Sequence, residues 1–123
     1  MTLSLATVAA HAAASKTAEP IVVLDVGEIF GITDHFVITA GRNDRQVRAI
    51  VDEVQKAVRE AGAKVVRPAE GLSDLAWVLL DYGDFIVHVF SVEARGFYDL
   101  ERLWRDATPL VIDGLLEPEQ VPG

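Results

Sequence analysis

Three aspartates, Asp25, Asp81 and Asp84, are the side chains of this sequence best suited to holding magnesium for phosphoryl transfer. Enzymes of that kind place their carboxylates beside backbone amides that bind phosphate. Asp81 and Asp84 flank a predicted turn, however, where aspartate is common because it hydrogen-bonds the local backbone. The sequence contains neither of the glycine-rich phosphate motifs, GxGxxG and GxxxxGK, nor the GxSxG nucleophile elbow. We therefore expect no catalytic residues and no cofactor.

The three histidines, His11, His35 and His88, do not form a recognisable metal site. No two of them have the i, i+4 spacing of a zinc-binding helix. The chain also lacks cysteine, which excludes a thiol nucleophile and a cysteine-based zinc site. Scattered surface or sheet histidines explain the pattern better, so we expect no bound metal.

The charge of the chain favours a basic protein partner. There are 19 acidic and 11 basic residues, and the formal net charge is −8. Such a chain repels nucleic-acid phosphates, and the arginines and lysines of residues 42–59 alternate with carboxylates, as on a solvated helix face. Residues 68–101 carry seven carboxylates and one arginine. We expect no direct reading of nucleic acid, because this acidic surface suits a basic protein.

The sequence predicts a cytoplasmic protein without a membrane segment. No apolar run approaches the roughly 20 residues that span a bilayer. The alanine-rich N-terminus lacks the basic region of a signal peptide and is interrupted by His11. The absence of cysteine also suits a reducing compartment.

Propensity, capping and periodicity predict a single α/β domain. Helices are expected over residues 2–16, 43–61 and 93–106, and strands over residues 21–26, 35–40, 64–66, 77–81 and 84–90. This order is not a strict βαβ alternation, which disfavours a doubly wound parallel fold. We expect a mixed sheet of about five strands with helices packed on it. Residues 108–123, which contain three prolines, are expected to form a mostly extended tail with an apolar contact near residues 110–112.

The second helix has the clearest signals. Asn43 is placed to cap it, with Gln46 positioned to reach back, and Gly62 follows its predicted end. An apolar stripe at helical spacing predicts its buried face. The stripe consists of Val47, Ile50, Val51, Val54, Val58 and Ala61.

The segment WVLLDYGDFIVHVF, residues 77–90, predicts a hairpin with two different faces. If Tyr82 and Gly83 form a two-residue loop, Leu80 opposes Phe85 and Val78 opposes Val87. That face is wholly apolar, and we expect helices to cover it. The other face is mixed. It carries Trp77, Leu79, Asp81, Asp84, Ile86 and His88.

The mixed face has two readings. A tryptophan beside aliphatic residues, rimmed by carboxylates, has the composition of a protein-binding hot spot. Alternatively, Trp77 fills space beneath the loop of residues 68–75. Two residues of the final predicted helix are also open: Arg95 either pairs with Asp99 or contacts a partner, and Tyr98 lies beside the apolar stripe with its hydroxyl outward.

Several of these segments, taken in order, resemble the ribosomal silencing factor, or Iojap, family. They are DHFVI (34–38), RQV (45–47), EG (70–71), WVLLDYGD (77–84), VHVF (87–90) and YDLERLW (98–104). The resemblance covers residues 3–107, and ordered motifs with matching gaps rarely arise together. It divides the chain into a family domain, residues 1–107, and a C-terminal tail, residues 108–123.

The resemblance implies a nucleotidyltransferase-like fold without catalytic residues. It also implies binding to the large ribosomal subunit through ribosomal protein L fourteen, which blocks joining of the small subunit and lowers translation in starved or stationary cells. The residues that we expect to contact the partner are Trp77, Leu79, Asp81, Tyr82, Asp84, His88, Arg95 and Tyr98.

Two other functions stay open from the sequence. One is a nucleotidyltransferase-like enzyme or nucleotide-binding protein, and the other is a homodimer formed off the ribosome through the mixed face. The chain also departs from the family pattern at Gly96, where a polar residue is usual, which puts the start of the last helix in question.

Overall fold

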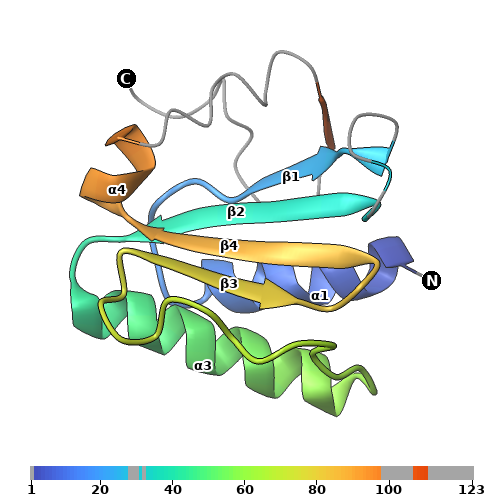
Figure 1. Cartoon of the computed structure of the whole chain (residues 1–123), viewed down its shortest axis with the longest axis horizontal. Helices are drawn as coiled ribbons and strands as arrows, with labels where there is room; N and C mark the ends of the chain where they lie inside the picture. Colours follow the sequence, from blue (N-terminus) through green and yellow to red (C-terminus); the bar gives the residue numbers. More distant parts are fainter. Residues whose placement is uncertain (1, 28–30, 32, 98–106, 111–123) are drawn as a thin grey trace.

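The computed structural model describes residues 2–27, 31, 33–97 and 107–110 as a mixed sheet with two helices against one face (Figure 1). The strands are β1 (Val22–Asp25), β2 (His35–Gly41), β3 (Trp77–Asp81), β4 (Phe85–Ser91) and β5 (Thr108–Leu110). The helices are α1 (Thr2–Ala14), α3 (Asp44–Glu60) and α4 (Val92–Phe97). The α/β class and the five-stranded mixed sheet are those predicted from the sequence. None of these helices is long and apolar enough to cross a membrane.

The sheet is built around one parallel pair. Its strand order is β3-β4-β2-β1-β5, and β2 and β4 pair in parallel from His35↔Phe85 to Gly41↔Ser91. The other neighbouring strands are antiparallel. Parallel neighbours need a crossover connection, and α3 with β3 supplies it. The crossover places α3 beside α1 under one face of the sheet (Figure 1).

The predicted signals of α3 are confirmed except for Ala61, which is exposed at the C-cap after the helix has ended at Glu60. The Asn43 side chain accepts a hydrogen bond from the Gln46 N–H at 2.8 Å, and the Gln46 side chain accepts one from the Arg42 N–H at 2.7 Å. Gly62 follows the helix with a φ of 99°. The buried stripe comprises Val47, Ile50, Val51, Val54 and Val58.

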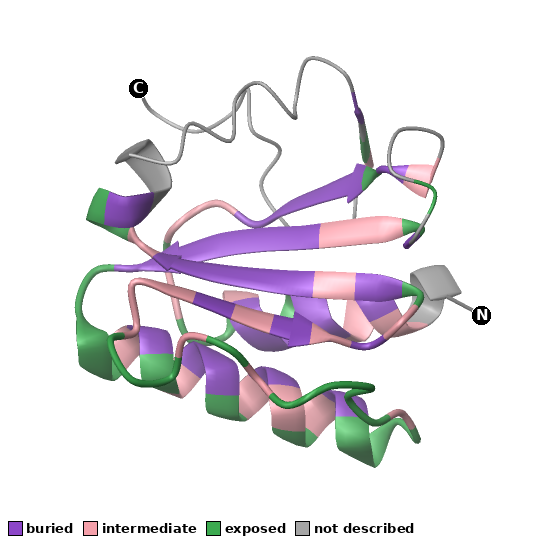
Figure 2. Cartoon of the chain, viewed as in Figure 1, coloured by how far each residue is buried: buried purple, intermediate pink, exposed green. Residues whose placement is uncertain are grey.

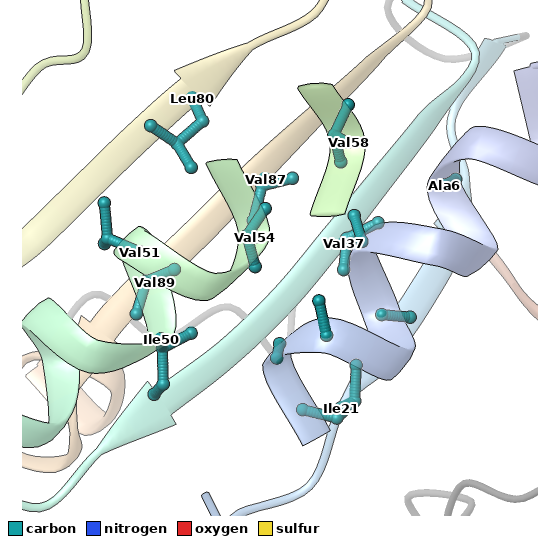
Figure 3. Close-up of a cluster of buried hydrophobic side chains, with 14 of the residues drawn as sticks. Ala6, Ile21, Val37, Ile50, Val51, Val54, Val58, Leu80, Val87 and Val89 are labelled. Atoms are coloured by element: carbon teal, nitrogen blue, oxygen red, sulfur yellow. The ribbon is translucent and has the colours of Figure 1, made fainter. Parts of the chain in front are cut away.

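The main core lies between this stripe, α1 and one face of the sheet (Figure 3). The hairpin contributes the residues that the alternation assigned to its apolar face, and all of them are buried: Val78, Leu80, Phe85, Val87 and Val89. Figure 2 shows the same alternation along β3, where buried and half-buried residues follow one another. The prediction that helices cover this face is confirmed.

The predicted strand over residues 64–66 is wrong. This segment forms no regular strand and is part of an exposed stretch beside β3. This stretch is bonded to β3 at two separate places. The Val66 N–H donates to the Asp81 carbonyl oxygen at 2.8 Å, and further along the chain Glu70 and Leu79 exchange two hydrogen bonds. Pro68 lies between these contacts and has no N–H to donate, which interrupts any continuous ladder.

The fifth strand is instead β5, which pairs antiparallel with β1 from Val23↔Leu110 to Asp25↔Thr108. These three residues were assigned to the extended tail from the sequence. Residues 111–123 lie outside the described residues, and the division of the chain at residue 107 stays a prediction.

The hairpin register also differs from the prediction. Leu80 pairs with Val87 rather than Phe85, and Val78 pairs with Val89. The turn centres on Gly83 and Asp84, because the Tyr82 N–H donates to the Phe85 carbonyl oxygen at 3.0 Å. Gly83 takes the positive φ of 87°, which tyrosine resists, at the first central position of the turn. The shift moves each partner by two residues, so every side chain stays on its predicted face.

The last helix begins at Val92, one residue before its predicted start. The Ser91 hydroxyl accepts a hydrogen bond from the Ala94 N–H at 3.0 Å, which is the bond of an N-terminal cap. The helix includes Gly96, so the departure from the family pattern does not prevent its formation. Residues 98–106, which were also predicted to be helical, lie outside the described residues.

We expect Gly71→Ala to destabilise the protein by about 2 kcal/mol or more, because the new side chain meets backbone. Gly71 has a φ of 88°, and a Cβ there would lie against the carbonyl oxygen of Trp77 and 2.9 Å from its carbonyl carbon. Urea unfolding measures the loss.

Gly62→Ala is the matched control. Gly62 also has a positive φ, of 99°, but a Cβ there would meet nothing within 4 Å. Its cost should be limited to the conformational penalty of about 1 kcal/mol. Equal losses for the two variants would contradict the steric argument.

Candidate functional site

The sheet face opposite α1 and α3 carries the candidate site. Part of it is covered, because Ala94 of α4 and Ala107 are buried in a second cluster with Val22, Ile38 and Phe90. Beside this cluster, apolar side chains from three strands are only half-buried. We call this part the open face. It consists of Phe36, Trp77, Leu79 and Ile86.

Strand pairing brings these residues together. Leu79 of β3 pairs with His88 of β4, and Ile86, which is also on β4, pairs with Phe36 of β2. Side chains that share a face across paired strands lie within contact range. Phe36 was missed from the sequence because only the parallel pairing of β2 with β4 places it beside the hairpin.

Trp77 is held in a fixed orientation by two neighbouring side chains of β4. Its indole stacks on Phe90, with ring centroids 5.1 Å apart and planes 22° apart. Its Nε1–H donates a hydrogen bond to Nδ1 of His88 at 3.0 Å. The ring thus packs on the sheet while remaining half-buried, and the choice between the two readings of Trp77 stays a prediction.

His88 lies beneath the open face, with only 7% of its surface exposed. Burial lowers the pKa of its imidazole to about 4, so the ring is neutral at pH 7. Since Nδ1 accepts the bond from Trp77, the proton belongs on Nε2. That nitrogen is buried without a hydrogen-bond partner among the described residues, and the Phe36 ring packs against the imidazole at 4.6 Å in an edge-to-face arrangement.

Asp81 and Asp84 differ in their surroundings. The partly buried Asp81 carboxylate accepts a hydrogen bond from the Gly83 N–H at 2.8 Å and lies 3.7 Å from Arg67. Asp84 is exposed at the tip of the hairpin. Asp84 therefore offers its charge to solvent, whereas Asp81 is used largely within the chain.

Of the three remaining predicted contacts, the structure describes only the side chain of Tyr82, which does not belong to the open face. Tyr82 is buried on the other side of the sheet, stacked on Phe85 at 4.9 Å and 18°. Burial raises the pKa of its hydroxyl, and the nearby Arg59 opposes that rise. Arg95 is part of α4, but its side chain lies outside the described structure, as does all of Tyr98.

The arrangement does not assemble the magnesium site considered from the sequence. Asp25 lies on β1 and Asp81 on β3, three strand spacings or about 14 Å apart. The Asp25 and Asp81 carboxylates each accept a local N–H, from Gly27 and Gly83 respectively. In the part of the chain that the structure describes, no group of three His, Cys, Asp or Glu side chains could hold a metal ion.

Comparison with known proteins identifies the family. Residues 2–122 match the sequence profile described as "Ribosomal silencing factor during starvation". The chain belongs to the ribosomal silencing factor family. The resemblance seen in the sequence motifs is thereby confirmed.

Individual members of the ribosomal silencing factor family agree along most of their length. The ribosomal silencing factor of Halalkalibacterium halodurans is 40% identical over 108 residues, which cover 88% of this chain and 92% of that protein. The one from Bacillus subtilis is 42% identical over 104 residues, 85% and 87% of the two chains. A crystal structure of a Chromobacterium violaceum protein superposes with a TM-score of 0.79 at 30% identity, covering 97% of this chain and 98% of that one.

We expect His88 to make stability pH-dependent. The folded-state pKa of about 4 lies below the unfolded value of about 6.5, so the unfolded state binds the proton first. The contribution of His88 to the free energy of unfolding is therefore fully present above pH 6.5. It declines as the pH falls towards 4, by about 3 kcal/mol in all. Urea unfolding at a series of pH values measures the slope.

His88→Gln should flatten this slope between pH 6.5 and 5, whereas His11→Gln, at an exposed histidine, should leave it unchanged. A wild-type slope that persists in His88→Gln would show that other groups cause it.

Proposed function

We propose that this protein represses translation by binding the large ribosomal subunit through ribosomal protein L fourteen and so blocks joining of the small subunit. Its membership of the ribosomal silencing factor family supports a ribosome-associated role in silencing translation. The contact with ribosomal protein L fourteen, the exclusion of the small subunit, action in starved or stationary cells and a cytoplasmic location belong to the proposal. It includes no catalytic step, and the family is named for silencing rather than for an enzymatic reaction.

The open face is the observation that carries the proposal. It combines half-buried apolar side chains with an exposed carboxylate, Asp84, on the neighbouring turn. Interfaces of this kind bind through a few well-packed apolar or aromatic anchors. The stacked and hydrogen-bonded Trp77 is such an anchor, since its ring loses little conformational freedom when a partner binds.

The charge of the chain supports a basic partner. The net charge of −8 gives long-range attraction towards a basic ribosomal protein and repulsion from bare RNA. Asp84 is the hairpin carboxylate best placed to contribute, because Asp81 already lies beside Arg67. We therefore assign Asp84 to the rim of the binding surface and the open face to its centre. His88 acts beneath that surface by holding Trp77.

Mixing the protein with isolated subunits tests the proposal. It should co-sediment with the large subunit and not with the small one, and it should suppress their association as its concentration rises. Equal binding to both subunits would contradict the proposal. A homodimer that involves the open face and binds neither subunit would favour the self-association seen as an alternative from the sequence.

Asp84→Lys should slow association with the large subunit and change its dependence on salt, because rim charges act mainly on the rate of encounter. The effect should be greatest at low salt, since screening reaches about 8 Å at 0.15 M. Stopped-flow kinetics at several salt concentrations measure it. Glu60→Lys is the control, because it makes the same charge change at an exposed site on the helix layer. Equal slowing of both variants would remove Asp84 from the binding surface.

Leu79→Ala should weaken binding to the large subunit about tenfold or more, as expected for a residue at the centre of an interface. Leu79 is only half-buried, so the substitution should lower the stability of the fold less than the affinity for the large subunit. Val66→Ala is the control, because Val66 is 60% exposed and lies outside the open face. Equilibrium co-sedimentation and thermal unfolding of each variant separate the two effects. Unchanged binding of Leu79→Ala would place the interface elsewhere.

A further inference from the structure

A hollow of about 370 Å³ lies on the helix side of the molecule, away from the open face. It is bordered by the C-terminal part of α3, the segment after that helix and the residue that follows β3. The residues that line it are Gln55, Arg59, Ala63, Lys64, Val65 and Tyr82. Its volume is within the range of sites that bind small molecules.

The polar side chains around this hollow have no partners within the described structure. Gln55, Arg59, Lys64 and the Tyr82 hydroxyl form no side-chain hydrogen bond or ion pair with any described residue. Three other arginines of the chain do form ion pairs with carboxylates. Arg42 lies 3.4 Å from Glu19, Arg48 lies 3.4 Å from Asp52, and Arg67 lies 3.7 Å from Asp81. Two cations without carboxylates therefore face one concave site.

Tyr82 shows that these groups converge. Its ring is stacked on Phe85, which leaves the hydroxyl edge as the part that can line the hollow. Arg59 is close enough to lower the pKa of this hydroxyl against the effect of burial. The guanidinium group and the hydroxyl therefore line the same hollow. Both can donate hydrogen bonds to an anion.

The end of α3 opposes an anion less than a free helix C-terminus would. Helix C-termini normally repel negative charge through their free carbonyl groups. Here the carbonyl oxygens of Ala57, Val58 and Arg59 accept hydrogen bonds from the N–H groups of residues 61–63. Three of the last four carbonyl groups of α3 are thus used within the turn that ends the helix.

We infer that this hollow binds a small organic phosphate of about the size of a nucleoside monophosphate. Arg59, Lys64 and the Tyr82 hydroxyl hold the phosphate group, while Ala63 and Val65 contact the less polar part of the ligand. A phosphate monoester carries a charge near −2 at pH 7. It matches the two cations better than a carboxylate, whose single charge would leave one of them uncompensated.

This site is independent of ribosome binding. Tyr82 follows β3 on the side covered by the helices, whereas Leu79 and Trp77 belong to the opposite side of the sheet. Both surfaces can be occupied at once. A failure of either proposal therefore leaves the other standing.

Titration of the isotope-labelled protein with AMP, adenosine and inorganic phosphate, followed by amide chemical shifts, tests the inference. AMP should bind more tightly than either fragment, and its shifts should centre on residues 55–65 and 82–83. Arg59→Gln and Lys64→Gln should each weaken AMP binding about tenfold, as loss of a charge-assisted bond predicts. Tyr82→Phe should weaken it less while retaining the buried ring.

Lys56→Gln is the control for charge. Lys56 is exposed on α3 but does not line the hollow, so this variant should bind AMP like the wild type. Absence of AMP binding, shifts centred elsewhere, or adenosine binding as tight as AMP binding would overturn the inference. So would equal weakening by Lys56→Gln and Arg59→Gln, because that result would indicate general attraction to positive charge. Thermal unfolding confirms that each variant is folded.

Discussion

The parallel pairing of β2 with β4 is the constraint on which the rest of the structure depends. Seven consecutive residue pairs join these central strands, and their alternation assigns each side chain to one of two faces. Val37 and Val87 face the helices, while Phe36 and Ile86 face the other way. Because parallel strands cannot be joined by a short turn, the chain crosses through α3, which covers the first face. The second face is left partly open, and it is the face to which we assign the proposed partner contact.

The elements with local signals were predictable from the sequence. The Asn43 cap, the apolar stripe and Gly62 define α3, and alternation assigned the two faces of the hairpin correctly. The errors concern edges and turns. Residues 64–66 have the β-branched composition of a strand but form only separate bonds to β3, whereas β5 is a strand through its pairing with β1. Non-local pairing of this kind leaves little trace in a three-residue segment.

The candidate site was predictable where it depended on alternation and not where it depended on strand order. Trp77 and Leu79 are on the predicted face, but Phe36 joined them only through the parallel pairing. Tyr82 belongs to the opposite side, and its spacing from Val78 and Leu80 already contained that information. Composition alone could not show that His88 is buried, because the same residue type serves at surfaces and in cores.

The loose segment beside β3 also limits how the sheet can assemble with other chains. An uncovered edge strand offers a row of free N–H and C=O groups to which another strand can add. Here the Asp81 carbonyl accepts a bond from Val66, and both backbone groups of Leu79 are bonded to Glu70. At the far edge, Pro109 of β5 has no N–H to offer. Both described edges thus offer few free backbone groups for strand addition, so a partner of this sheet would have to be bound through side chains rather than backbone.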